Sequence, residues 1–192
     1  MNSKKILIAT FMLVALVQLY VPAKMILDQE KLLATGIEFK FKTAPIDPYD
    51  PFRGKYITLN YAENEIVIHK EKDWATGETI YVSLTKGKDG LAKIKSVSKE
   101  KPAHNATYVK AKVLYVTDNG SNKLIIAYPF DRFYMEESKA YAAEQAYQQS
   151  QQDTTKLTYA LVNIQNGNAV LKDVLIDGTS IREVVKGNQE KK

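Results

Sequence analysis

The chain has 192 residues, of which 27 are Lys or Arg, 22 are Asp or Glu and none is Cys. This length is enough for one domain of ordinary size, and 45% hydrophobic with 26% charged residues argues against a disordered or polytopic protein. The lack of Cys excludes disulfides, thiolate zinc sites, iron–sulfur clusters, Cys nucleophiles and lipid attachment through Cys. With only His69 and His104, histidine-based catalysis is disfavoured as well.

A stretch of apolar residues begins directly after Lys4 and Lys5 and extends from Ile6 to Ala23. Its 18 residues are just enough to cross the hydrocarbon core of a bilayer, roughly 30 Å thick, as a helix. Because the two lysines precede the stretch, the positive-inside bias puts the N-terminus in the cytoplasm and the rest of the chain outside. We therefore expect a single-pass protein of the cytoplasmic membrane, anchored through helix 6–23, with an extracytoplasmic (periplasmic) C-terminal domain.

The same segment also has features of a signal peptide, with Val21 and Ala23 as the small residues before a cut. Against cleavage, the apolar positions between Met25 and Leu33 continue a helical pattern directly out of the span. We expect an uncleaved anchor whose helix fills residues 1–35 and is ended by Gly36. Export after cleavage near Ala23 is the alternative.

The body of the protein, residues 36–182, reads as short strands separated by turns rich in Gly, Asn and Asp. The expected strands are 37–42, 53–61, 65–69, 79–84, 91–97, 107–117, 123–128, 157–164 and 169–176. One short helix, from Glu136 to about Gln149, interrupts them, and Ala140, Ala143 and Tyr147 form its packed face. The pattern predicts a mainly β, antiparallel barrel-like or sandwich-like domain, followed by a charged flexible tail at 183–192.

A proline-rich segment precedes the second expected strand, with Pro45, Pro48 and Pro51 at every third position. This spacing predicts a polyproline-II helix of three residues per turn. On that helix Asp47, Asp50 and Arg53 share one edge. Two interpretations stay open: a rigid connector tied by an Asp–Arg pair, or a binding edge for a cation or a charged group of a partner.

The strand that follows Gly54 alternates between two faces. Ile57, Leu59 and Tyr61 share one face, which we expect to be the core. The other face consists of Tyr56, Thr58 and Asn60. A glycine before a strand is typical of a bulge or of a close approach between backbones.

The sequence from Pro45 to Tyr61 resembles the signature of the GDYXXLXY family, named for Gly-Asp-Tyr-x-x-Leu-x-Tyr. Gly54, Tyr56, Leu59 and Tyr61 occupy motif positions, while Lys55 stands where the motif has Asp and argues against a catalytic acid or metal ligand there. The N-terminal span resembles the family too, as do, more loosely, residues 132–136 and the Asp-Gly turn at 177–178. The resemblance implies a bacterial membrane-anchored protein without an assigned activity, whose relatives are often encoded beside, or fused to, polytopic membrane proteins.

No pattern of residues indicates an enzyme. His69 and His104 lack a nucleophile motif, and Ser83 lies too far along the chain for a signal-peptidase-like serine–lysine pair. The charges form no basic stripe for nucleic acid. We therefore expect no cofactor, no metal site and no nucleic-acid partner, and we favour a non-enzymatic protein over an enzyme.

The favoured interpretation is an accessory or binding partner of another envelope protein, such as a polytopic membrane protein. An envelope hydrolase or peptidase with an unrecognised site, and a small-ligand carrier, are the alternatives. Tyrosine and arginine are the residue types that anchor protein interfaces. The motif and candidate interaction residues are Pro45, Asp47, Pro48, Asp50, Arg53, Gly54, Tyr56, Leu59, Tyr61, Arg132, Tyr134 and Glu136.

Overall fold

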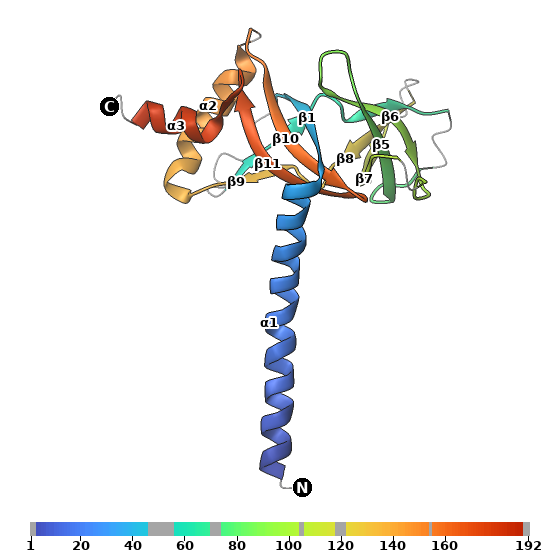
Figure 1. Cartoon of the computed structure of the whole chain (residues 1–192). Coiled ribbons are helices and arrows are strands. Elements are labelled where there is room, and N and C mark those ends of the chain that lie inside the picture. Colours follow the sequence, from blue (N-terminus) through green and yellow to red (C-terminus); the bar gives the residue numbers. More distant parts are fainter. Residues whose placement is uncertain are drawn as a thin grey trace.

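The computed structural model describes residues 3–45, 56–69, 74–103, 106–117, 122–153 and 155–189. The helices in these ranges are α1 (Ser3–Thr35), α2 (Glu137–Gln152) and α3 (Ile181–Gln189). The strands are β1 (Ile37–Ala44), β2 (Tyr56–Thr58), β3 (Asn60–Tyr61), β4 (Glu65–Val67), β5 (Thr79–Lys86), β6 (Ala92–Ser98), β7 (Tyr108–Val116), β8 (Lys123–Ala127), β9 (Arg132–Tyr134), β10 (Thr158–Gln165), β11 (Asn168–Ile176) and β12 (Thr179–Ser180). Figure 1 shows α1 projecting from the β body, with α2 and α3 together on one side of it.

The described strands form two antiparallel sheets of five strands, which curve into a nearly closed barrel. Their orders are β12-β11-β10-β1-β3 and β4-β8-β7-β5-β6, and β2 and β9 form a separate pair. On one side of the barrel, a short connection between the edge strands β3 and β4 joins the two sheets. On the other, parallel bridges join Lys40 to Leu91 and Val109 to Gly167. The expected barrel-like antiparallel fold is confirmed.

The alternating pattern of β1 explains its place in the fold. Phe39 and Phe41 are buried, and the intervening Lys40 and Lys42 are exposed. Inside the barrel the ring of Phe41 packs against the rings of Tyr61, Tyr128 and Phe130, at centroid distances of 5.0–5.5 Å. Burying large rings in this way is the main contribution to core stability.

The predicted helix end at Gly36 is confirmed, but its cause differs from a left-handed cap. Gly36 is not among the glycines with positive φ, and its N–H donates to Leu32 O at 2.9 Å. A Cβ at this position would lie 2.6 Å from that carbonyl oxygen and 3.1 Å from Asn163 Cβ. Glycine is therefore required because the last turn of α1 and strand β10 both lie close to this position.

The C-terminal region departs from the expected flexible tail over residues 183–189. These residues belong to α3, in which Ile181 and Val185 are fully buried. Ile181, Val184 and Val185 have the i, i+3, i+4 spacing that places apolar side chains on one helix face. The body thus contains a second helix beside α2, because this short stripe packs on α2 and β11.

Three smaller differences concern strands. The segment expected as one strand up to Tyr61 is interrupted at Leu59, whose N–H donates to Asp131 O at 2.8 Å instead of to a strand partner. In addition, β9 and β12 were not expected from the sequence. Both are very short, so they show no alternation of their own and depend on pairing with other strands.

Candidate functional site

Strands β2 and β9 bring the motif residue Tyr56 next to two candidates from a distant part of the chain. In this pair Tyr56 lies opposite Tyr134, and Thr58 lies opposite Arg132. The ring centroids of Tyr56 and Tyr134 are 5.3 Å apart, and Arg132 Cζ lies 5.0 Å from the centroid of the Tyr56 ring. We call Tyr56, Arg132 and Tyr134 the Tyr–Arg surface.

Strand alternation places the Tyr–Arg surface outside the barrel. Ile57 and Phe133, between its members, are buried in the core. Tyr134 is 60% exposed, Arg132 is exposed and Tyr56 is half-buried. The expected division of the strand into an inner face (57, 59, 61) and an outer face (56, 58, 60) is thus confirmed.

The guanidinium of Arg132 supplies the positive charge of the Tyr–Arg surface and contacts the aromatic side chains of Tyr56 and Tyr134. A side-chain hydrogen bond with Tyr134 is the main cause that raises the pKa of Arg132, followed by the nearby Tyr56 and Asp131. Among the described residues no carboxylate lies within ion-pair distance of the guanidinium. An arginine stacked on a ring and without a carboxylate partner can accept an anionic or aromatic group from another molecule.

The other two described motif residues, Leu59 and Tyr61, belong to the core. Both are buried. Tyr61 Oη donates to Phe130 O at 2.7 Å, and its ring packs edge-on against the Phe130 ring at 5.3 Å. A side chain buried in this way cannot contact a partner, so these two positions hold the fold together beneath the Tyr–Arg surface.

Glu136, the third candidate of the second segment, is engaged within its own helix start. It is the residue before α2, and its carboxylate accepts hydrogen bonds from Ser138 Oγ, at 3.0 Å, and from Lys139 Nζ. The contact with Lys139 is the main cause that lowers the pKa of Glu136. Its partners among the described residues are therefore local.

Most of the proline-rich segment lies outside the described residues. This applies to Asp47, Pro48, Asp50, Arg53, Gly54 and Lys55. Pro45 is described and is exposed directly after β1. The two interpretations of the Asp–Arg edge therefore stay as predictions.

A buried network of hydroxyl groups was not recognised from the sequence. Thr158 Oγ1 donates to Ser150 Oγ at 2.9 Å, Ser150 Oγ donates to Tyr147 O at 2.7 Å, and Thr43 Oγ1 donates to Thr158 O at 3.0 Å. Gln151 Nε2 donates to Thr43 Oγ1 at 2.8 Å. These bonds join α2 to β1 and β10. Buried hydroxyls that find partners in this way make the docking of a helix specific.

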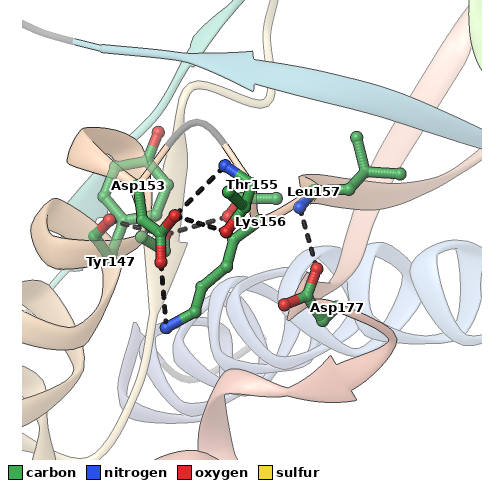
Figure 2. A network of polar contacts seen from close by, with 8 residues as sticks. Tyr147, Asp153, Thr155, Lys156, Leu157 and Asp177 are labelled. Atoms are coloured by element: carbon green, nitrogen blue, oxygen red, sulfur yellow. Dashed lines mark hydrogen bonds and ion pairs between the residues drawn. The ribbon is translucent and has the colours of Figure 1, made fainter.

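The loop after α2 extends this network toward the solvent (Figure 2). Asp153 Oδ1 accepts hydrogen bonds from the N–H and the hydroxyl of Thr155, at 3.1 and 2.6 Å. The contacts with Thr155 lower the pKa of Asp153. Asp177 Oδ1 accepts from Leu157 N–H at 2.8 Å, and so the Asp177-Gly178 turn is fastened to the start of β10. These carboxylates have structural partners rather than catalytic ones.

The geometry offers little for the enzyme and carrier alternatives. Ser83 is only 8% exposed within β5. No group of three His, Asp or Glu side chains in the described ranges is placed to hold a metal ion. The aromatic rings of Phe41, Tyr61, Tyr128 and Phe130 occupy the barrel interior, where a ligand carrier needs open space.

One family matches the chain, under the description GDYXXLXY protein, and the match covers residues 18–174. No curated protein and no solved structure matches the chain at a significant level. The matched region includes the second half of α1 and the body as far as β11, together with every residue of the Tyr–Arg surface. The chain therefore belongs to the GDYXXLXY family.

Proposed function

We propose that this protein is a membrane-anchored accessory protein whose extracytoplasmic barrel binds another membrane protein. The observation that carries the proposal is the exposed apolar surface of α1. This helix is long and apolar enough to span a membrane, and no residue of its apolar part is buried. Such an apolar surface is rarely left to water, so a bilayer is the environment that fits it.

The joint between α1 and the barrel supports a role at a fixed position above the membrane. Leu32 is buried against the body, and Asn163 Nδ2 donates to Leu33 O at 2.7 Å. Gly36 then leads directly into β1, so no flexible linker separates helix and barrel. A rigid joint suits a protein that presents one surface to a neighbour in the same membrane.

The distribution of charge at the N-terminus supports the orientation. Lys4 and Lys5 precede the apolar span, which favours a cytoplasmic N-terminus and an extracytoplasmic barrel. The helix is continuous through Ala23 and Lys24, the point at which a signal peptidase would cut. Continuity favours the uncleaved anchor over export as a soluble protein.

The Tyr–Arg surface is the candidate contact for the partner. Tyrosine and arginine supply much of the binding energy at protein interfaces, because they combine large contact areas with hydrogen bonds. An extracytoplasmic loop with an acidic or aromatic side chain would meet Arg132 and the ring of Tyr134. Confinement of both proteins to one membrane raises their effective concentration, so a modest surface is sufficient.

Affinity purification of the tagged full-length protein from detergent-solubilised native membranes tests this proposal. We expect a polytopic membrane protein to co-purify with the wild type and to be reduced at least tenfold with Arg132→Gln. Arg182→Gln is the matched control, because Arg182 also stacks on a ring of this strand pair, 4.8 Å from the Phe133 centroid, but on the other side of β9. Equal recovery from both variants and the wild type would contradict the role of the Tyr–Arg surface.

The anchor is tested separately. The intact mass of the purified protein shows whether residues 1–23 are retained, and extraction of membranes with alkaline carbonate shows whether the protein spans them. We expect the full-length mass and retention in the membrane pellet. A mass that begins near Lys24, or release into the supernatant, would contradict the anchor.

A further inference from the structure

A cleft of about 600 Å³ lies where α1 meets the barrel. One wall consists of the last turns of α1, from Met25 to Leu32. The opposite wall is the turn between β10 and β11, from Gln165 to Asn168, and the start of β11. Lys110 of β7 and Pro129 complete the lining. A volume of this size is typical of sites for small molecules.

The lining combines cationic, amide and apolar groups. Lys31 and Lys110 have no carboxylate partner in the described part of the chain. The cleft's carboxylate, Asp28, is neutralised by Lys24 at 2.8 Å. The lining residues also include four with a side-chain amide and several apolar ones: Gln29, Gln165, Asn166 and Asn168, and Met25, Leu32, Ala169 and Val170. This composition fits a ligand with an anionic group, hydroxyl groups and an apolar part.

The position of the cleft along α1 narrows the choice of ligand. Lys24 is the first charged residue after the apolar span, and Met25 and Leu32 lie at most about 12 Å beyond it along the helix axis. The polar layer of a bilayer begins where the hydrocarbon core ends and is roughly 5–8 Å deep. In an anchored protein the part of the cleft beside Met25 and Asp28 therefore lies at the level of the lipid phosphates.

The walls are fixed before any ligand binds. Lys110 N–H donates to Gly167 O at 2.8 Å, which holds β7 against the β10–β11 turn. Asn163 Nδ2 donates to Leu33 O at 2.7 Å and so holds the last turn of α1 against β10. A preformed site loses less conformational entropy on binding than a flexible one.

We propose that this cleft binds the headgroup of an anionic phospholipid, with Lys31 and Lys110 as the phosphate-binding residues. The proposal rests on the proposed membrane anchor. The amides hydrogen-bond the headgroup hydroxyls, and Met25, the lining residue closest to the apolar span, contacts the glycerol. The bound lipid would then fill the angle between the anchor and the barrel.

Native mass spectrometry of the full-length protein in detergent, titrated with phosphatidylglycerol or phosphatidylcholine, tests this site. We expect one tightly bound phosphatidylglycerol. A single lysine at a charged membrane surface contributes about fivefold in affinity, so the double variant Lys31→Gln/Lys110→Gln should bind about 25-fold more weakly. The matched control is Lys95→Gln/Lys101→Gln, which removes the same charge from exposed lysines outside the cleft. Thermal melting of both variants verifies that they are folded.

Each outcome decides the proposal. Equal binding of the two lipids, or an equal loss in both double variants, would overturn it, because only general charge attraction would remain. Inorganic phosphate and soluble glycerol phosphate are also compared as competitors of the bound lipid. If inorganic phosphate displaces the lipid at the same concentration as glycerol phosphate does, the cleft is a site for free phosphate and the proposal is overturned. Retention in carbonate-washed membranes without lipid preference refutes the cleft alone, whereas loss from the membranes refutes the anchor.

Discussion

Tyr61, Tyr128 and Tyr147 are among the buried tyrosines of the described residues, and each lies in a different element or loop. Tyr61 donates to Phe130 O, and Tyr128 Oη donates to Glu63 O at 2.9 Å. Tyr147 lies in α2. Burial raises the pKa of all three hydroxyls, in the case of Tyr147 to about 12. A neutral tyrosine is favoured in the folded state because the core cannot solvate a phenolate.

The raised pKa values predict a loss of stability at alkaline pH. Below about pH 10 these tyrosines hold their protons in both states and contribute no pH dependence. Above pH 10 the unfolded state releases protons that the folded state keeps, so Tyr147 lowers the free energy of unfolding by up to about 1.4 kcal/mol per pH unit until pH 12. Urea unfolding of the body between pH 9 and 11.5 measures this slope.

Tyr147→Phe should show a shallower slope than the wild type over this range. Tyr141→Phe is the matched control, because Tyr141 belongs to the same helix and is exposed. If Tyr147→Phe and Tyr141→Phe follow the same pH dependence, the hydroxyl of Tyr147 does not carry the effect.

At the scale of elements, the hairpin between β10 and β11 closes the barrel. Asn166 and Gly167 have φ values of +53° and +86°, and a two-residue hairpin turn of type I′ requires positive φ at both positions. The turn packs on β7, and a Cβ on Gly167 would lie 2.7 Å from Tyr108 Cε2. Glycine is therefore required here both for the backbone conformation and for space.

Gly167→Ala should destabilise the barrel more than the same change in an open turn. Strain at positive φ costs about 1–2 kcal/mol, and the forced shift of Tyr108 adds about 1–3 kcal/mol. Gly178→Ala is the matched control, because Gly178 has a similar φ of +81° and nothing within 4 Å of its Cβ position. Urea unfolding measures both, and equal losses would show that the contact with Tyr108 adds nothing.

The elements differ in how far the sequence predicts them. The long strands and the Asn166-Gly167 and Asp177-Gly178 turns follow from alternation and turn residues, which act locally. In contrast, β9 exists because Tyr134 and Arg132 pair with Tyr56 and Thr58, a contact that no local pattern encodes. The inner and outer faces of the motif strand were therefore predictable, whereas the Tyr–Arg surface that it forms with β9 was not. The cleft beside α1 likewise combines four separate segments of the chain.

For the whole molecule, the decisive feature is the joint at Gly36. A side chain here would collide with Leu32 O at 2.6 Å, and that carbonyl belongs to the backbone of the helix. Gly36→Ala should therefore loosen or tilt α1 relative to the barrel without unfolding it. Because the chain has no Cys, labels can be attached uniquely to cysteines introduced at Tyr20 and Lys95.

Electron–electron spin distances between these labels, in detergent, measure the joint. We expect a narrow distribution for the wild type and a broader or displaced one for Gly36→Ala. Gly187→Ala in α3, where a Cβ meets nothing within 4 Å, is the matched control and should retain the narrow distribution. A broad distribution already in the wild type would refute the rigid joint.

A helix that is rigidly joined to the barrel transmits its own tilt to the barrel. The 33 residues of α1 make it about 50 Å long. A spanning helix adjusts to the thickness of its bilayer by changing its tilt. If α1 cannot bend at Gly36, the barrel must incline by the same angle, and the Tyr–Arg surface then changes its height above the lipid. The reach of this surface would thus depend on the thickness of the membrane that holds the protein.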